Sequence, residues 1–238
     1  MRYQRKIWVP ISIRKADKII AISNFTKKDI ENNYKFSINK IEIIYNYFNF
    51  NKYSSLKNIM NVEQPYFLSI CSTAVHKNTI SVLKAFAKFC SFDDRFNLVL
   101  VGALNNSKSE AYKFYNNLDN KIKNRIILFK NISNEELSFL YSNASLFISM
   151  TLFEGLGMPI VEAMYFNIPL LLSNLDVCKE VSNNTGIYCD PFDHSVIAKH
   201  LIEFAKAPYK VETKELIEHQ YSEVKTSKKY IDLLNNFS

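Results

Sequence analysis

Two glutamates and two glycines are concentrated in one short stretch of the chain, residues 153–164. Glu154 and Glu162 stand eight positions apart, and Gly155 and Gly157, two of only four glycines in the chain, follow the first glutamate. Glycine lets the backbone adopt positive φ or approach a ligand closely, so we expect a tight, ligand-facing turn. Carboxylates at such a turn can accept hydrogen bonds from sugar or ribose hydroxyls. The alternative is a solvated Glu154 and a Glu162 that only complements a helix dipole.

A helix is predicted directly after this turn. Pro159 suits the first helical position, and Ile160 to Met164 would follow, with Glu162 in the first turn. The unpaired amides and the positive dipole end of a helix favour an anion, such as a diphosphate. The sequence therefore predicts that hydroxyl and phosphate groups of one ligand meet at this turn.

The stretch FEGLGMPIVEAM, residues 153–164, resembles the E-x7-E signature of retaining, nucleotide-sugar-dependent glycosyltransferases of family 4, the glycosyltransferase group 1 family, which have the GT-B fold. Flanking segments agree with that family in order along the chain. They are Lys77-Asn78 after a predicted strand, Asn167-Ile168-Pro169, Glu180, and Cys189 to Asp193. The resemblance extends from about Ala16 to the C-terminal helix.

The resemblance implies a role for each candidate residue. Lys77 would neutralise the donor diphosphate as the glycosidic bond breaks, whereas by itself it could be a surface lysine at a helix start. Glu162 would hold the ribose hydroxyls, and Glu154, the predicted catalytic residue, would hold the sugar. The other predicted donor-binding residues are Gly155, Leu156, Gly157, Met158 and Ile132. We expect the donor to be a UDP- or GDP-sugar, with no metal and no further cofactor.

Several positions depart from the family pattern. His76 stands where many relatives carry arginine, and Cys71 where some carry a phosphate-binding arginine. Both departures weaken the expected phosphate clamp. Asn131 replaces the usual glycine near the nucleobase; like Asn167, it could adopt left-handed backbone in place of glycine. Met150-Thr151 replaces the common Pro-Ser before the signature.

Composition bounds the other functions of the chain. Residues 1–60 hold 12 Lys and Arg against 4 Asp and Glu, which gives this quarter of the chain a net charge of +8. The whole chain has a net charge of +7. This quarter could contact anionic lipid headgroups, although solvated helix faces are the alternative. We expect no nucleic-acid partner, because no recognised motif accompanies the charge. No apolar run is long enough for a membrane span or a signal-peptide core, so we expect a cytoplasmic protein, with contact at the inner face of the membrane.

The cysteine and histidine patterns argue against a disulfide framework and a structural metal site. The four cysteines, Cys71, Cys90, Cys178 and Cys189, lie far apart and are expected to be reduced core residues. The histidines are equally dispersed, so no structural metal is expected. A dinucleotide-dependent oxidoreductase would need G-x-G-x-x-G after its first strand, and Gly102 is isolated.

Apolar segments alternate with amphipathic ones along the chain, which predicts an α/β fold: a Rossmann-like parallel sheet with helices on both faces, the C-terminal half of a GT-B fold. Such sheets bind ligands at the carboxyl ends of their strands. The predicted strands are 18–22, 41–44, 66–71, 97–102, 125–129, 146–149, 169–173 and 186–189. The predicted helices are 24–34, one containing 83–90, 107–119, one opened by a capping box at 133–136, the one after the turn, 193–206, 212–219 and 223–235.

Four parts are predicted along the chain. Residues 1–50 resemble the tail of an N-terminal acceptor domain, 51–64 a linker, 65–220 a nucleotide-sugar-binding domain, and 221–238 a C-terminal helix. We therefore expect transfer of a hexose, with retention, to a polysaccharide or lipid-linked glycan acceptor, in concert with a missing N-terminal domain that a separate chain could supply. A catalytically inactive nucleotide-sugar-binding remnant is the alternative. Apolar residues near the start should be exposed, namely Ile7, Trp8, Val9, Ile11 and Ile13.

Overall fold

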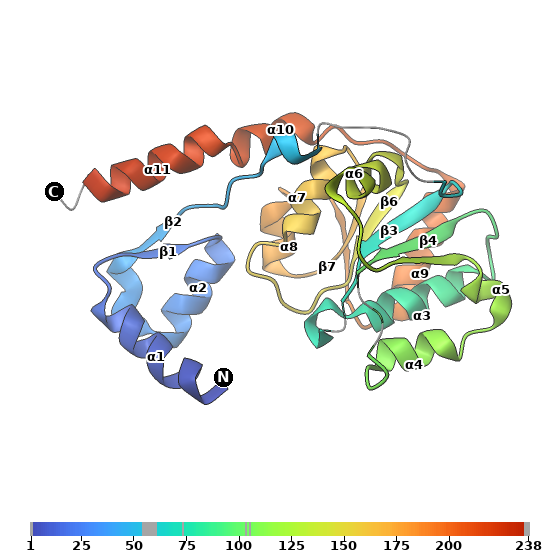
Figure 1. Cartoon of the computed structure of the whole chain (residues 1–238), viewed down its shortest axis with the longest axis horizontal. Helices are drawn as coiled ribbons and strands as arrows, with labels where there is room; N and C mark the ends of the chain where they lie inside the picture. The colour runs from blue at the N-terminus through green and yellow to red at the C-terminus, as the bar shows by residue number, and fades with distance from the viewer. Residues whose placement is uncertain (1, 54–60, 73, 103, 105, 236–238) are drawn as a thin grey trace. The chain divides into compact units, whose positions relative to one another are not determined.

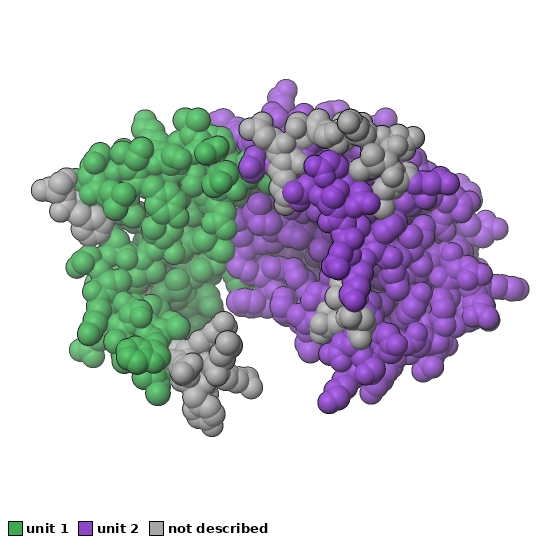
Figure 2. All heavy atoms as spheres, in the orientation of Figure 1, with its two compact units in different colours: residues 1–48, 220–238 green, residues 49–219 purple. Residues whose placement is uncertain are grey.

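A computed structural model describes residues 2–53, 61–72, 74–102, 104 and 106–235. The chain divides into two compact units, which Figure 2 colours separately. Unit 1 comprises residues 1–48 and 220–238, and unit 2 comprises residues 49–219. The segment predicted as a linker, 51–64, lies partly outside the described residues, but Tyr53 within it is buried in unit 2 and is only 3% exposed.

Unit 2 is built around a parallel six-stranded sheet with the order β5-β4-β3-β6-β7-β8 (Figure 1). Its strands are β3 (Tyr66–Ile70), β4 (Asn97–Val101), β5 (Ile126–Phe129), β6 (Leu146–Ser149), β7 (Leu170–Ser173) and β8 (Ile187–Cys189). Most of their residues are buried, as expected of a parallel sheet that is covered on both faces. The predicted fold class is confirmed.

Helices cover both faces of this sheet. On one face α3 packs against both α4 and α9, and on the other α7 packs against α8, beside α6 (Figure 1). The bounds are α3 (Thr79–Phe89), α4 (Glu110–Asn116), α5 (Asn120–Lys123), α6 (Asn134–Asn143), α7 (Met158–Tyr165), α8 (Asp176–Val181), α9 (His194–Lys206) and α10 (Lys214–Gln220). The α3 and α9 face holds an apolar core in which the rings of Phe67 and Phe96 stack 4.8 Å apart.

The chain reverses its direction of travel across the sheet between β3 and β6. From β3 it moves outward through β4 to β5, then returns to pair β6 with β3 and moves outward again through β7 to β8. Two adjacent strands whose connections leave in opposite directions open a crevice at their carboxyl ends, where open α/β sheets bind ligands. The loops that follow β3 and β6 carry Lys77 and Glu154, respectively.

Most predicted elements of unit 2 are present, with differences at their ends. The capping box is confirmed: the Ser133 hydroxyl accepts from the Glu136 amide, and the Glu136 carboxylate accepts from the Ser133 amide. The helix predicted over 107–119 is shorter, Glu110–Asn116, because Ser109 caps it and a second short helix, α5, begins after Asp119. Helix α8 was missing from the sequence prediction.

Unit 1 contains a two-stranded parallel sheet and four helical segments. Its elements are α1 (Arg2–Lys15), β1 (Ile19–Ala21), α2 (Asn24–Asn33), the 3-10 helix η1 (Lys35–Lys40), β2 (Ile41–Ile43) and α11 (Glu223–Asn235). Helix α11 is tied to the segment after β2, because the Thr226 hydroxyl donates to the Tyr45 carbonyl oxygen at 3.2 Å. Residues 220–238 therefore group with the start of the chain.

Helix α1 exposes apolar side chains, as predicted for Ile7, Trp8, Val9 and Ile11, with Trp8 64% exposed. The prediction that Ile13 is exposed too is wrong in part, because this residue is half-buried. None of the described helices is long and apolar enough to cross a membrane. Contact of this surface with another domain, a second copy or a membrane stays a prediction.

Candidate functional site

The loop after β3 holds Lys77 in a short 3-10 helix, η3 (Val75–Lys77), that ends at the left-handed Asn78 (φ 48°). The loop after β6 binds this helix from the other side of the crevice. The His76 carbonyl oxygen accepts from the Leu152 amide at 2.7 Å and from the Thr151 hydroxyl at 3.0 Å. Two hydrogen bonds to one carbonyl oxygen thus fix the two loops against each other.

Lys77 and Glu154 form an ion pair across the crevice. Lys77 Nζ lies 2.5 Å from Glu154 Oε1, and the two side chains are 22% and 17% exposed. The buried Thr151 hydroxyl lies 3.3 Å from the same carboxylate oxygen. A cation and a carboxylate therefore meet at the carboxyl ends of β3 and β6, where they are partly screened from water. That these residues contact one ligand stays a prediction.

Glu162 faces a different set of neighbours. The Tyr53 hydroxyl donates to Oε1 at 2.6 Å, and the Tyr141 hydroxyl donates to Oε2 at 2.7 Å. Glu162 was expected in the first helical turn, and this is wrong: α7 begins at Met158, so Glu162 is its fifth residue. Its carboxylate contacts α6, which carries Tyr141.

Between the two glutamates the chain makes the predicted tight turn. Gly157 adopts left-handed backbone (φ 79°) and caps α7, whereas Gly155 does not adopt positive φ. Leu156 is buried, so its side chain packs inside the protein. Of the first helical positions, Pro159 has no amide hydrogen, and the Ile160 amide donates to the Gly157 carbonyl oxygen at 2.9 Å. Pro159 therefore has no N–H to donate to an anion, and the Ile160 N–H is already used. This helix end offers fewer free amide donors to a phosphate than the sequence predicted.

The remaining predicted positions lie on nearby loops. Met158, the first residue of α7, is half-buried at the turn. Ile132 is half-buried in the loop between β5 and α6, the helix that also carries Tyr141. Asn167 adopts φ 56°, as expected of a residue in place of glycine, whereas Asn131 does not adopt positive φ.

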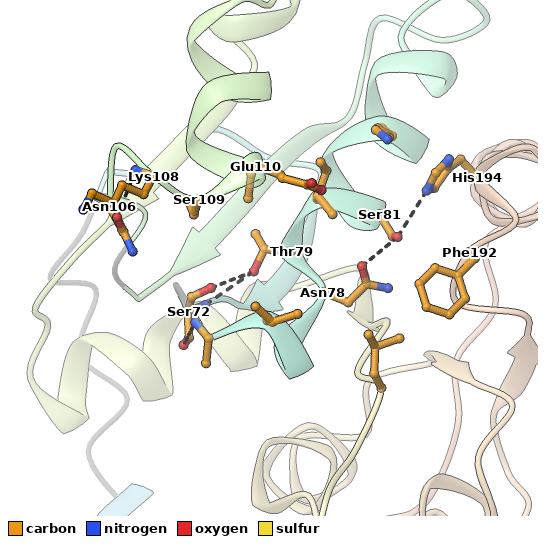
Figure 3. Close-up of a pocket in the computed structure, with 16 residues that line it drawn as sticks. Ser72, Asn78, Thr79, Ser81, Asn106, Lys108, Ser109, Glu110, Phe192 and His194 are labelled. Carbon is orange, nitrogen blue, oxygen red and sulfur yellow. Dashed lines mark hydrogen bonds between the residues drawn. The ribbon is translucent and has the colours of Figure 1, made fainter. Parts of the chain in front are cut away.

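A cavity of about 500 Å³ lies beside the N-terminal half of α3, and its lining includes Val75 and Asn78 of the loop after β3 and Leu152 of the loop after β6. Figure 3 shows Ser81 between Asn78 and His194; its hydroxyl donates to Asn78 Oδ1 at 2.9 Å and lies 3.2 Å from His194 Nε2. Lys84 and Lys108 also line this cavity. None of its described lining residues is one of the predicted donor-binding residues. It is therefore a second location at which binding can be tested.

The cysteines are free, as predicted, and Cys71, Cys178 and Cys189 are buried. Burial raises the pKa of the Cys71 thiol to about 11 and that of Cys178 to about 12, so both stay protonated at neutral pH. Within the described part of the chain, no three His, Cys, Asp or Glu side chains are grouped as metal ligands.

Three polar neighbours of the glutamates were absent from the predicted site. Thr151 was noted only as a departure from the family pattern, and neither Tyr141 nor Tyr53 was singled out. Tyr53 is separated from Glu162 by 109 positions and Tyr141 by 21, so no local spacing joins them to it. A tyrosine at a buried helix position was the one available signal, because a buried hydroxyl needs a polar partner.

The sequence profile of the family described as "Glycosyl transferases group 1" matches residues 54–222 of the chain. The chain is 28% identical to the O-antigen chain mannosyltransferase RfbU of Salmonella typhimurium over 183 residues, 77% of this chain and 49% of that protein. It is 26% identical to the alpha-1,3/1,6-mannosyltransferase ALG2 of Dictyostelium discoideum, over 74% of this chain and 50% of that protein. The chain thus spans about half the length of these curated relatives.

Solved structures share the fold at low sequence identity. Sucrose-phosphate synthase from Thermosynechococcus elongatus superposes with a TM-score of 0.82 at 16% identity, covering 99% of this chain and 62% of that one. The Anabaena protein HepE, solved with UDP-glucose, superposes with a TM-score of 0.81 at 16% identity, covering 99% of this chain and 68% of that one.

Proposed function

The chain belongs to the glycosyl transferases group 1 family, and we propose that it binds the nucleotide-sugar donor of a hexosyl transfer in the crevice at the carboxyl ends of β3 and β6. The observation that carries this proposal is the Lys77–Glu154 ion pair, which joins the loops after these two strands. A cation poised over the crevice suits the diphosphate, and a carboxylate beside it suits the sugar hydroxyls. The match to the family covers both loops.

Donor binding would separate the ion pair. The diphosphate offers Lys77 more negative charge than Glu154 does, so Lys77 moves its hydrogen bonds to phosphate oxygens. The freed Glu154 carboxylate then accepts from sugar hydroxyls. During transfer the bond between the anomeric carbon and the diphosphate oxygen breaks, the acceptor hydroxyl oxygen bonds to that carbon with retention, and its proton passes to the leaving diphosphate. Lys77 stabilises the negative charge that develops on the leaving diphosphate.

Donor binding needs no metal in this proposal. Many phosphate sites neutralise the diphosphate with a divalent cation held by carboxylates. Here the carboxylate nearest the crevice is already paired with a lysine. Lys77 would supply the positive charge by itself, and the donor would be the only small molecule required.

Mannose is the sugar that the relatives favour. Both curated relatives named above are mannosyltransferases, and the name of one describes it as an O-antigen chain mannosyltransferase. We therefore propose a mannosyl donor and a polysaccharide or lipid-linked glycan acceptor. The acceptor oxygen must be held near the anomeric carbon with water excluded. We propose that a partner domain or chain supplies the residues that bind the acceptor and exclude water.

The two glutamates should affect different parts of the donor. Glu162→Ala is expected to weaken binding of UDP or GDP by about 1–3 kcal/mol, the usual loss when a charged hydrogen-bond acceptor is removed. Glu154→Ala should leave binding of the free nucleotide unchanged and weaken only the intact nucleotide sugar. Calorimetric titration of each variant with nucleotide and nucleotide sugar measures both effects. Equal loss of plain nucleotide in both variants would contradict this division.

A further inference from the structure

Glu162 is held by two tyrosines from different parts of the chain. Tyr53 follows the boundary between the two units and donates to Oε1 at 2.6 Å, and Tyr141 on α6 donates to Oε2 at 2.7 Å. Each carboxylate oxygen therefore receives one short hydrogen bond from the protein. Glu162 itself is half-buried.

Both tyrosines are rigid donors. The Tyr141 ring is fully buried and stacks on Phe166 with centroids 5.7 Å apart and planes 5° apart. The Tyr53 ring meets the edge of the same Phe166 ring at 5.8 Å. Burial and the neighbouring Glu162 carboxylate raise the pKa of both phenols well above the ordinary value. The hydroxyls thus stay protonated at neutral pH, where they can donate to the carboxylate.

The arrangement leaves a defined acceptor capacity on the carboxylate. An ionised carboxylate offers about four lone-pair sites, two on each oxygen. One site on each oxygen is used by a tyrosine, so about one on each oxygen remains. A vicinal diol, such as the 2′- and 3′-hydroxyls of a ribose, carries two donors at the spacing of two carboxylate oxygens. The carboxylate is therefore oriented to receive both hydroxyls at once.

We propose that Tyr53 and Tyr141 are positioning residues for the nucleotide ribose, which fix the rotation of the Glu162 carboxylate so that both of its oxygens face the diol. This inference rests on the proposed function, because it assumes that a nucleotide binds at Glu162. It adds that ribose recognition depends on Tyr53, which precedes the family-matched region 54–222. A residue of unit 2 outside the family-matched region would thus contribute to the donor site.

The test compares Tyr53→Phe and Tyr141→Phe with the matched control Tyr66→Phe. Tyr66 is also fully buried, and its hydroxyl donates to the Leu140 carbonyl oxygen at 2.8 Å, next to Tyr141 but not on Glu162. Each protein is titrated with UDP and GDP and with their 2′,3′-dideoxy forms. The ratio of the two affinities measures recognition of the diol alone, which general damage to the fold does not change.

We expect the wild-type chain to prefer the ribose form, and each Tyr→Phe variant at Glu162 to lose about 3- to 10-fold of that preference, the range for one orienting hydrogen bond. The dideoxy nucleotides should bind all four proteins equally well. Tyr66→Phe should keep the full preference even if it unfolds at a lower temperature. If Tyr141→Phe does not fold, Tyr53→Phe decides the question.

Three results would overturn the inference, and they have different meanings. In the first, the wild-type chain prefers the ribose form and the Tyr53→Phe and Tyr141→Phe variants prefer it equally. This result would exclude a positioning role for the tyrosines and leave the proposed function intact. A wild-type chain that binds ribose and dideoxy forms alike would remove the ribose role of Glu162, and with it both proposals for this residue. Tighter ribose binding by Tyr53→Phe would instead make this tyrosine a competitor of the ribose.

Discussion

Lys77→Ala is expected to weaken binding of UDP or GDP by about 1.5–3 kcal/mol, roughly ten- to a hundred-fold, because a charge-assisted hydrogen bond to the diphosphate is lost. The loss should lie at the upper end of this range. In the wild type Lys77 Nζ lies 2.5 Å from the Glu154 carboxylate, so in the proposed site the ammonium shields that carboxylate from the phosphates. Without the ammonium, the Glu154 carboxylate faces the phosphates and repels them. Calorimetric titration of the variant with both nucleotides measures the change.

Glu154→Gln is the matched control for this prediction. Glutamine keeps the shape of the side chain but removes the charge that competes for Lys77. We expect this variant to bind free UDP or GDP at least as tightly as the wild type, while it binds the nucleotide sugar less tightly. If Lys77→Ala and Glu154→Gln weakened the free nucleotide equally, the ion pair would be only a structural clasp between the two loops.

The second large effect concerns Gly102, directly after β4. Gly102 has φ +128°, and a Cβ atom placed on it would lie 2.0 Å from the carbonyl oxygen of Cys71. The obstacle is backbone at the end of β3, which cannot move without separating β3 from β4. We expect Gly102→Ala to lower the free energy of unfolding of unit 2 by about 3–5 kcal/mol, the combined cost of backbone strain and overpacking. Urea denaturation followed by far-UV circular dichroism measures this change.

Gly186→Ala provides the comparison. Its added Cβ would meet the side chains of Leu170 and Leu172 at 3.3 and 3.4 Å, so small shifts can accommodate it. A loss of about 1 kcal/mol or less is expected, as for most substitutions without a backbone clash. Equal losses at both glycines would show that the approach of Gly102 to Cys71 does not constrain the sheet.

The order of strands and helices in unit 2 was predictable because its signals are local. Buried parallel strands read as short apolar runs, and Ser133 with Glu136 marks a helix start within four residues. The turn between the glutamates was predictable because glycine is scarce in this chain and Gly157 needs left-handed backbone. The crevice followed from the general rule for parallel sheets, which places ligands at the carboxyl ends of the strands.

The partners of the glutamates were not predictable in the same way. Tyr53 lies in a segment without apolar periodicity, and its contact with Glu162 exists only once unit 2 has folded. Even the position of Glu162 in its helix was misjudged, because Pro159 is the second residue of α7 and not the first. A one-residue shift of a helix start lies within the usual uncertainty of such boundaries.

The central claim is that this chain binds a nucleotide sugar between Lys77, Glu154 and Glu162, and a calorimetric titration with UDP- and GDP-mannose in the presence of a chelator tests it most directly. We predict saturable one-to-one binding of one of the two donors without a divalent metal, weakened roughly ten- to a hundred-fold in Lys77→Ala and unchanged in Lys84→Ala, since Lys84 lines the cavity beside α3. Binding that requires a metal, or that is unchanged in Lys77→Ala and weakened in Lys84→Ala, would contradict the account.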